Sequence, residues 1–425
     1  METLHINKPF TFPNGSTIRN RLVKSAMAEG YMEPDCLPGD GLITNYSRWA
    51  QGGWGMLITG NYMIDPKGMS FPGMLLVNND TVSREVQVAK LKAFASAARA
   101  NGTKIIAQLC HPGRAGILIP GRGGKNIAPS PIRISFGDGF IARALAALMT
   151  GTPREMTRED IDNIVGKFAS AARLMAEAGF DGVELHGAHG YLISQFLSAE
   201  SNQRTDEYGG SALDRTKFAV QVIEAVKAAV PDGFIVGIKL NSVDYQTDRS
   251  AQATKEGHVM NTEKQLQECV DQFGAIAAAG VDYVNVSGGT MENPRMANGP
   301  PKSTRTKARE AFFLSFAESF RASFPDVPLM VTGGFHSRTG MEEAVAGGGT
   351  DLVGIGRGAC ACPSLPSDVV LNPEVADSEA RVVLKKYPVP WWLSWGPQMV
   401  GVGWENNFYS AMIRALGTEQ EGKKN

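Results

Sequence analysis

The chain has 425 residues, of which 43% are hydrophobic, and it carries a formal net charge of −1 at pH 7. This balance gives no electrostatic reason to expect nucleic acid or an anionic membrane as the main partner. The first residues predict no signal peptide, and no apolar run reaches the ~18 residues that a membrane span needs. The five cysteines are odd in number and scattered, which predicts reduced thiols in a cytoplasmic protein rather than a disulfide framework.

Short apolar runs alternate with segments of helical periodicity along most of the chain. Several of these runs are nearly continuous in valine, isoleucine and leucine, as strands covered on both faces should be. Eight such runs, each followed by a helix or a long loop, predict a (β/α)8 TIM barrel of the α/β class rather than a doubly wound sheet. The predicted strands are residues 22–27, 56–60, 104–109, 182–186, 234–240, 283–287, 329–332 and 352–355, and the predicted helices are residues 83–99, 158–178, 213–229, 263–279, 307–323 and 340–346.

Two segments outside this alternation have predicted positions in the barrel. Residues 10–18 predict a β-hairpin with Asn14-Gly15 as its turn, and its place before the first strand predicts that it closes the bottom of the barrel. Residues 115–153 form a long loop with glycine- and proline-rich stretches and a short helical patch. Loops of this length in a compact domain are usually functional, so we expect a lid over the site.

A tryptophan-rich segment follows the eighth predicted strand. It holds four of the six tryptophans, at positions 391, 392, 395 and 404. We therefore predict two parts, a TIM barrel over residues 1–365 and a C-terminal extension over residues 366–425. Aromatic side chains of the extension can pack on their own barrel or on a neighbouring subunit, which leaves a homo-oligomer open.

The most informative stretch is residues 182–191, where an apolar strand runs into His186, His189 and Tyr191. Glycines between and around these residues leave room for something large and flat beside their side chains. Imidazoles that hold an oxygen, next to a phenol that can release a proton, suit the reduction of a polarised double bond. The same spacing of histidines is also compatible with a metal pair or with structural histidines.

Other polar residues lie at the carboxyl ends of predicted strands, where barrels place their active-site groups. Gln108 offers a donor and an acceptor, as needed to recognise an amide-like ring edge. Lys239 ends a strand, so it is a core lysine paired with an acid, a Schiff-base lysine or a cation that faces a developing anion. Two glycine-rich loops, residues 331–335 and 353–358, follow strands seven and eight, where barrels commonly bind phosphate, and Arg357 adds a charged fork. Together these groups predict a pocket for flavin mononucleotide (FMN).

Several longer motifs are specific enough to indicate a family. They are residues 20–27 (NRLVKSAM), 108–114 (QLCHPGR), 179–191 (GFDGVELHGAHGY), 192–198 (LISQFLS) and 202–211 (NQRTDEYGGS), together with the two glycine-rich loops. Through these motifs the chain resembles, over residues 5–365, the Old Yellow Enzyme family of FMN-dependent ene-reductases, which are barrels of the NADH:flavin oxidoreductase type. The extension that follows is not covered by this resemblance.

The resemblance implies a reaction and roles for the site residues. NADH or NADPH would reduce FMN, and the reduced flavin would pass hydride to the β-carbon of an α,β-unsaturated carbonyl compound. His186 and His189 would hold the carbonyl oxygen of this small-molecule substrate, and Tyr191 would protonate its α-carbon. Lys239 would stabilise negative charge near flavin N1 and O2, and Gln108 would contact the pyrimidine edge. Along the isoalloxazine would lie Ser25, Ala26, Met27, Ala28 and Gly60, and the phosphate would be held by Gly333, Gly334, Gly356 and Arg357.

Ala28 departs from the family pattern. Family members commonly have threonine or cysteine at this position beside flavin O4, and alanine has no side-chain donor to offer there. We therefore expect a lower flavin potential, and slower reduction by NAD(P)H, than in relatives that keep the donor.

The presence of Tyr191 favours a net reductase over a flavin-dependent isomerase that lacks the proton donor. Two further interpretations are compatible with the sequence: a flavin-binding barrel that scavenges or senses electrophiles, and a metal-dependent hydrolase. The hydrolase would use His186 and His189, with His111 as the nearest third ligand. Specificity for the natural substrate is expected from the loop at residues 115–153 and from an insert at residues 244–260.

Overall fold

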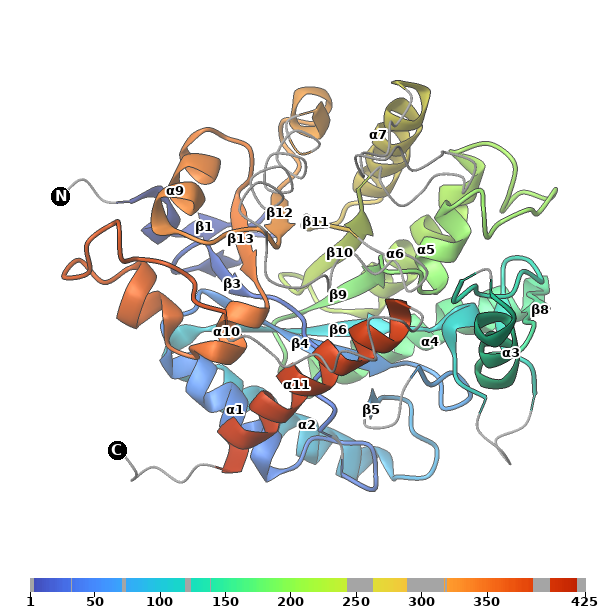
Figure 1. Ribbon diagram of the computed structural model, residues 1–425, viewed down its shortest axis with the longest axis horizontal. Helices are drawn as coiled ribbons and strands as arrows, with labels where there is room; N and C mark the ends of the chain where they lie inside the picture. The colour runs from blue at the N-terminus through green and yellow to red at the C-terminus, as the bar shows by residue number, and fades with distance from the viewer. Residues whose placement is uncertain are drawn as a thin grey trace.

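Within the residues that the structure describes, eight parallel strands close into a barrel that helices surround (Figure 1). The strands are β3 (Leu22–Lys24), β4 (Met56–Met63), β6 (Lys104–Cys110), β9 (Gly182–Gly187), β10 (Ile235–Asn241), β11 (Tyr283–Ser287), β12 (Leu329–Thr332) and β13 (Leu352–Ile355). Around the barrel they follow in the order β3, β13, β12, β11, β10, β9, β6 and β4, and the pairing of β3 with β4 closes the circle. The predicted (β/α)8 TIM barrel is confirmed.

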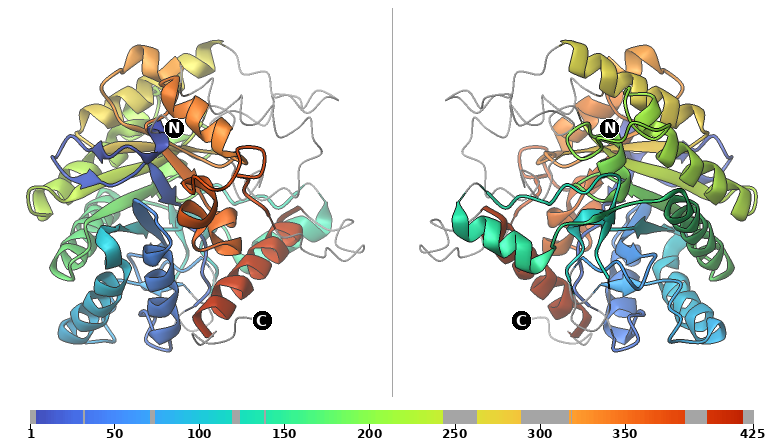
Figure 2. Two further views of the ribbon diagram at one scale, coloured as in Figure 1. Left: turned by 90° about the vertical axis from the view of Figure 1, so that its left-hand side faces the viewer. Right: turned by 90° about the vertical axis from the view of Figure 1, so that its right-hand side faces the viewer.

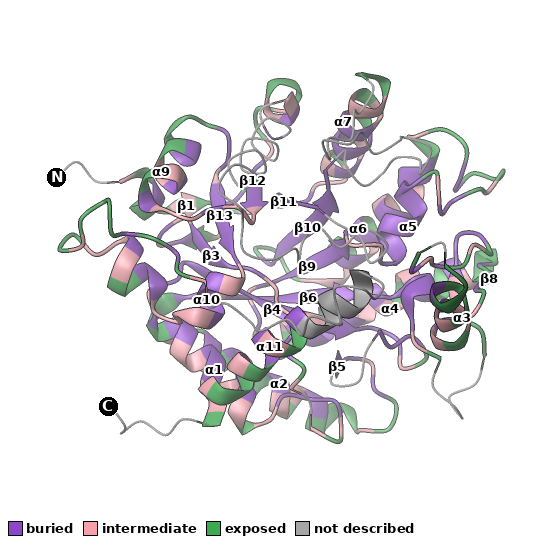
Figure 3. Ribbon diagram, in the orientation of Figure 1, coloured by how far each residue is buried: buried purple, intermediate pink, exposed green. Residues whose placement is uncertain are grey.

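The computed structural model describes residues 4–31, 33–70, 74–118, 124–137, 139–242, 263–288, 317, 319–384 and 398–418, of which residues 398–404 are described by their backbone. In this part of the chain the barrel strands are almost wholly buried, and the helices expose their outer faces (Figure 3). No helix among the described residues is long and apolar enough to cross a membrane.

All eight predicted strands are present; the ends of β6, β9 and β10 differ from the prediction by one residue, and those of β3 and β4 differ by three. β3 ends at Lys24 rather than at residue 27, because the chain leaves the sheet there to form the loop that leads to the next helix. β4 continues to Met63, past the predicted end at Gly60, because its last residues pair with the short strand β5 (Leu75–Leu76).

The helices alternate with the strands as predicted. The predicted ones are α2 (Arg84–Ala98), α3 (Phe140–Met149, the helical patch of the long loop), α4 (Arg158–Glu177), α6 (Lys217–Ala229), α7 (Glu263–Ala278) and α9 (Arg338–Ala346). The helix predicted at residues 307–323 lies mostly outside the described residues. Helices that the sequence reasoning missed are α1 (Asp40–Gln51), α5 (Leu192–Leu197), α10 (Arg357–Ala361) and α11 (Gln398–Thr418).

The N-terminal hairpin is present and fills one end of the barrel. Its strands β1 (Phe10–Thr11) and β2 (Thr17–Ile18) pair antiparallel, and Gly15 in the turn has a left-handed backbone with φ +85°. The Phe12 ring lies 5.9 Å from that of Tyr283 in β11, measured between ring centroids. Phe12 packs in a buried cluster with residues from the first half of most barrel strands, so the hairpin closes the amino-terminal end as predicted.

The segment after β13 returns to the barrel through two helices. α10 follows β13 directly, and α11 lies along α1 and α10 on the outside of the barrel (Figure 2). Asn45 Nδ2 of α1 donates to the carbonyl of Ile413 in α11 (2.6 Å), and Ile413 is fully buried. The described part of the extension therefore contacts its own barrel, while the predicted division at residue 365 and any contact with a neighbouring subunit stay predictions.

Candidate active site

Neighbouring strands bring the predicted reacting groups to the carboxyl end of the barrel. His186 in β9 is in register with Lys239 in β10, and Gln108 in β6 is in register with Glu184 in β9. Residues two apart on a strand face the same side of a sheet, so Glu184 and His186 point the same way. Gln108, His186 and Lys239 are each at most 3% exposed. The structure thus gathers the predicted amide, cation and first histidine in one buried region.

The His186 ring contacts the rings of both His189 and Tyr191. The centroids of His186 and His189 lie 5.0 Å apart, and those of His186 and Tyr191 lie 4.7 Å apart at an interplanar angle of 71°. His186 Nδ1 accepts the backbone N–H of Ala188 (3.3 Å). The ring proton of His186 is therefore on Nε2, which is left to donate to a ligand.

His189 is held in place by the ends of two neighbouring strands. Its backbone is left-handed (φ +60°), a conformation that costs a non-glycine residue about 1–3 kcal/mol and persists where the surroundings hold it. The backbone N–H of His189 donates to Asn241 Oδ1 (3.1 Å), and its Nε2 lies 3.0 Å from Ser287 Oγ. Asn241 ends β10 and Ser287 ends β11. The sequence reasoning assigned no role to either residue, although a polar side chain at a strand end was the signal available.

Burial decides the protonation of these groups at neutral pH. It lowers the pKa of His186 well below the ordinary value, and the His189 ring and the Lys239 ammonium lower this pKa further. The pKa of His189 is lowered by burial and by Lys239 in the same way. Burial raises the pKa of Tyr191, and the nearby Cys110 adds to the rise. The site therefore holds two neutral imidazoles beside a phenol that keeps its proton.

A buried carboxylate, that of Glu184, fixes the amide of Gln108. Glu184 Oε1 accepts from Gln108 Nε2 (2.6 Å), and its Oε2 accepts from Tyr283 Oη (3.1 Å) and Asn285 Nδ2 (2.8 Å). Gln108 Oε1 is buried and has no partner among the described residues. Burial lowers the pKa of Lys239, and the charge of Glu184 opposes that change. Glu184 was missed by the sequence reasoning, although its place two residues before His186 in one strand could have indicated it.

The loop after β3 lies between two glycines of the predicted FMN site, Gly60 beside the ring and Gly356 beside the phosphate. A Cβ on Gly60 would lie 2.5 Å from the carbonyl oxygen of Met27, and a Cβ on Gly356 would lie 2.9 Å from Met27 Sδ. The backbone N–H of Gly60 also donates to the buried Glu29 Oε1 (2.9 Å). Gly60 is needed for this close approach, because a Cβ there would meet the backbone of Met27, whereas the flexible Met27 thioether could move away from a Cβ at position 356.

The residues on either side of Met27 differ in exposure. Ser25 is fully buried with its hydroxyl 3.0 Å from Thr332 Oγ1, whereas Ala26 and Ala28 are half-buried. The carbonyl of Ala28 accepts a hydrogen bond from Ser410 Oγ of α11 (2.7 Å). The effect of alanine at position 28 on the flavin potential stays a prediction.

The predicted phosphate residues lie at the ends of two paired strands, β12 and β13. Gly333 and Gly334 have left-handed backbones (φ +100° and +89°), and a Cβ on Gly333 would meet no atom within 4 Å. The Gly333 N–H donates to the carbonyl of Gly354 (3.2 Å), which holds the two glycine-rich loops together. Arg357 begins α10, and its Nη1 donates to Glu405 Oε1 of α11 (2.7 Å).

Comparison with known proteins identifies the family. The family model for NADH:flavin oxidoreductases and NADH oxidases matches residues 5–372. The chain belongs to this family. The resemblance to Old Yellow Enzymes that the motifs indicate is confirmed, and the protein is an oxidoreductase whose cofactor is FMN and whose reductant is NADH or NADPH.

Relatives within the family are found among fungi. The chain is 42% identical, over 96% of its length, to the NADH-dependent flavin oxidoreductase iliE of Neonectria sp., but it spans 54% of that protein. It is 41% identical to the iliE protein of Hypocrea jecorina, with 92% of this chain and 95% of the relative covered. A solved structure of morphinone reductase has the same fold, with a TM-score of 0.66 and 22% identity over 92% of each chain.

The residues at the barrel mouth fit the chemistry of FMN. Gln108 Oε1 is a buried acceptor with no partner among the described residues, so it can accept a hydrogen bond from an N–H of the flavin ring. Lys239 is a buried cation, so it can stabilise an electron-rich edge of that ring. Gly60 and Gly356 keep side chains away from the loop after β3, and the open face at Gly333 leaves room for a phosphate. The individual contacts that these residues make with the flavin remain proposals.

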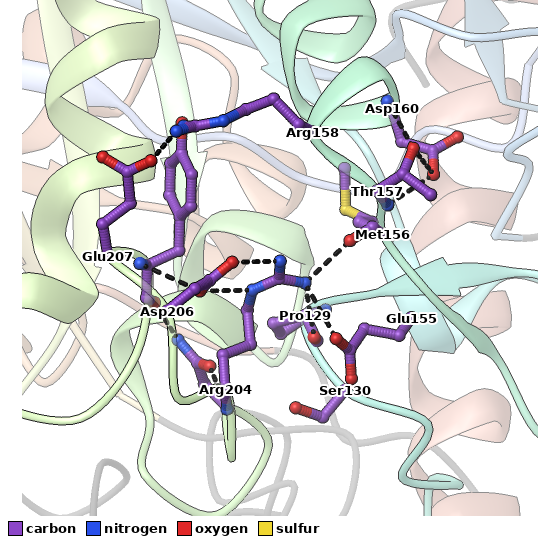
Figure 4. Close-up of polar contacts among 12 residues, drawn as sticks. Pro129, Ser130, Glu155, Met156, Thr157, Arg158, Asp160, Arg204, Asp206 and Glu207 are labelled. Atoms are coloured by element: carbon purple, nitrogen blue, oxygen red, sulfur yellow. Dashed lines mark hydrogen bonds and ion pairs between the residues drawn. The ribbon is translucent and has the colours of Figure 1, made fainter.

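A single arginine anchors the end of the long loop (Figure 4). Arg204 Nη1 donates to the carbonyls of Pro129 (3.1 Å) and Met156 (2.7 Å), and its Nε donates to Asp206 Oδ1 (2.9 Å). Pro129 lies next to β7 (Ile127–Ala128), and Met156 follows β8 (Arg154–Glu155), the short strands that pair in parallel on either side of α3. The base of the loop is thus fixed to the segment between α5 and α6, and the lid function of residues 115–153 stays a prediction.

Other predictions about the site are not decided by its geometry. Among the described residues, no three histidine, cysteine, aspartate or glutamate side chains gather into a metal site, and His111 Nε2 lies 4.0 Å from Asp65 Oδ2. The insert at residues 244–260 lies outside the described residues. The cytoplasmic location and the oligomeric state stay predictions.

Proposed function

We propose that the protein is an ene-reductase, which uses electrons from NADH or NADPH to reduce the carbon–carbon double bond of an α,β-unsaturated carbonyl compound. The observation that carries the proposal is the contact between the protonated phenol of Tyr191 and the neutral ring of His186, 4.7 Å apart between centroids. A proton donor beside an oxygen-binding group is what the addition of hydrogen across a polarised double bond requires.

The two histidines bind and polarise the substrate carbonyl. Because His186 Nδ1 accepts the Ala188 N–H, the proton of the neutral ring is on Nε2, which can donate to the substrate oxygen. His189 lies beside it, with its backbone fixed by Asn241 and its ring by Ser287. Neutral imidazoles donate hydrogen bonds to the oxygen as negative charge develops on it, and because their position is fixed, no rearrangement is needed during the reaction.

Tyr191 supplies the proton. Reduced FMN, which Gln108 and Lys239 would hold at the barrel mouth, would supply hydride for the β-carbon. The Tyr191 hydroxyl then gives its proton to the α-carbon, so that hydride and proton together saturate the double bond. Burial raises the pKa of Tyr191, while the side chains of Ser70 and Asn61 act in the opposite direction and favour the phenolate left after the transfer.

An anaerobic spectral titration tests this function. NADPH is expected to bleach the flavin absorbance of the holoenzyme, and cyclohexenone is expected to restore it. In Tyr191→Phe, we expect reoxidation by cyclohexenone to slow by about 10²–10⁴-fold, the usual contribution of a positioned acid, with reduction by NADPH nearly unchanged.

The matched control is Tyr208→Phe, a buried tyrosine that contacts Gln221 and Arg158 away from the site. It should leave both steps unchanged. Equal losses in both steps in Tyr191→Phe would contradict the proton-donor role. A flavoprotein that NADPH bleaches and that ignores enones would contradict the substrate class and favour another acceptor.

A further inference from the structure

The C-terminal helix α11 contacts the barrel at two places that are predicted to hold FMN. At one of them Glu405 Oε1 accepts from Arg357 Nη1 (2.7 Å), next to the glycine-rich loops. The Glu405 side chain is 2% exposed and that of Arg357 is 27% exposed. The carboxylate is thus buried behind the guanidinium, which faces solvent on its other side.

The second contact lies at the loop that is predicted to line the flavin ring. Ser410 Oγ donates to the carbonyl of Ala28 (2.7 Å), and Arg414 Nη1 donates to the carbonyl of Gly30 (3.1 Å). Ser410 and Arg414 are four residues apart and lie on one side of the helix, whereas Glu405 precedes Ser410 by five residues and lies about 140° away around the helix axis. The helix therefore contacts the two segments with different parts of its surface.

The helix is held firmly enough to position these side chains. Tyr409 is 2% exposed and Ile413 is fully buried, one and two turns beyond Glu405. A Cβ on Gly417 would lie 2.5 Å from the carbonyl of Gly41 in α1, so the two helices approach closely there. The position of Glu405 is therefore set by the packing of the whole helix against α1 and α10.

The contact between Glu405 and Arg357 leaves the guanidinium able to bind an anion. A guanidinium has five N–H donors in a fixed fork, and a single Nη1 contact to a carboxylate leaves the others for a phosphate. An arginine already fixed in one rotamer gives up less conformational entropy when the anion binds. The ion pair therefore favours phosphate binding by fixing the direction of the fork.

We propose that Glu405 is a positioning residue for the FMN phosphate, which acts by holding the Arg357 guanidinium, so that cofactor retention depends on the docking of the C-terminal helix. The proposal rests on FMN being the cofactor of this site. Residue 405 lies beyond the segment that matches the family model, residues 5–372, so the support comes from the extension and not from the family part of the chain.

A comparison of FMN with riboflavin tests the proposal, because riboflavin has the same ring and no phosphate. The dissociation constants of both flavins are measured on the full-length apoprotein by quenching of flavin fluorescence. In Glu405→Ala we expect the affinity for FMN to fall by about tenfold or more, the loss typical of one charge-assisted contact, with the affinity for riboflavin unchanged. Glu405→Gln keeps an acceptor for Arg357, so a smaller loss is expected; this variant carries the test if the alanine variant does not fold.

A double-mutant cycle shows whether Glu405 acts through Arg357. Arg357→Ala should weaken FMN binding, and adding Glu405→Ala to it should cause no further loss. Ser410→Ala is the matched control on the same helix, and it should leave the ratio of FMN to riboflavin affinity unchanged. Tighter FMN binding in the Glu405 variants, equal losses for both flavins, or additive losses in the cycle would each overturn the proposal. Failure of the wild-type protein to bind either flavin would instead overturn the cofactor assignment, and this proposal with it.

Discussion

Glu184 is a single carboxylate shared by donors from two other strands. It accepts from Gln108 in β6 and from Tyr283 and Asn285 in β11. An ionised carboxylate has acceptor capacity for all three donors, whereas a glutamine would present one oxygen and a donating amide. The orientation of the Gln108 amide, and with it the free Oε1, depends on this charge.

We predict that Glu184→Gln weakens FMN binding by about tenfold or more, because a lost hydrogen bond to a charged group costs about 1.5–3 kcal/mol and lets Gln108 turn its amide. The dissociation constant for FMN is the measurement. Tyr283→Phe is the matched control, since it removes one donor from Glu184 and keeps the contact with Gln108. Equal FMN affinities in the two variants would contradict the prediction.

Among single site residues, the sequence predicted those that share a short motif. It missed the residues whose side chains hold them in place. His186, His189 and Tyr191 were found together because a strand end and two glycines mark them. Asn241, Ser287 and Glu405 were missed because each contacts a site residue far away in the chain, at separations of 52, 98 and 48 residues. No local pattern contains such a contact before the fold is known.

Among the secondary-structure elements, the missed helices have weak local signals. α1 begins after Gly39 with no side-chain cap, and its stretch of glycine, threonine, asparagine and serine has low helix propensity. Its stability comes instead from packing, since Leu42, Tyr46 and Trp49 are fully buried. α11 likewise contains three glycines and is held by its contacts with α1, so tertiary structure decides both helices.

The anchor at Arg204 leads to a prediction about the long loop. Arg204→Lys keeps the positive charge but cannot reach both carbonyls and Asp206 with one ammonium, which should cost about 1–3 kcal/mol of local stability. We expect faster amide hydrogen exchange in residues 124–137 and 139–156, measured by mass spectrometry, with the exchange of the barrel strands unchanged.

The control for this prediction lies in the same loop. Arg133 is exposed and donates to Thr152 Oγ1 within the loop itself, so Arg133→Lys should alter the exchange of the loop much less. If the two variants exchange equally fast, Arg204 is not what anchors the loop to the barrel.

For the whole molecule, the barrel was predictable and the path of the extension was not. Eight apolar runs are each followed by an amphipathic segment or a long loop, so an error in one segment still leaves the barrel as the best interpretation. The extension has no such repetition. Its docking depends on the surface formed by α1 and α10, and neither of these helices was predicted.

A buried ionic cluster gives the whole fold a predicted pH dependence. Asp65 follows β4, His111 follows β6, and Lys167 lies on α4, with Lys167 Nζ 2.7 Å from Asp65 Oδ2. Burial lowers the pKa of His111 to about 4; the Lys167 charge acts in the same direction, and the Asp65 charge opposes it. In the unfolded chain a histidine has a pKa of about 6.5.

Between these two values the unfolded chain binds more protons at residue 111 than the folded one. The free energy of unfolding should therefore fall as the pH is lowered from about 6.5 to about 4, by up to about 1.4 kcal/mol per pH unit from this residue. Urea unfolding at pH 7, 6 and 5 measures the slope. His111→Gln should be less stable at pH 7 and show a shallower slope, and an unchanged slope would contradict the assignment.

The hairpin covers the amino-terminal end of a barrel whose interior is filled by side chains, so we expect both reactants of the proposed function to reach the site from the carboxyl end. If the proposed function holds, the oxidised nicotinamide must leave the carboxyl end before the unsaturated carbonyl compound can bind there. The two reactants are then expected to bind alternately at the same site, and an excess of either one should inhibit binding of the other. The hairpin at residues 10–18 thus adds to the closure of the amino-terminal end, and the order of binding would be set at the carboxyl end.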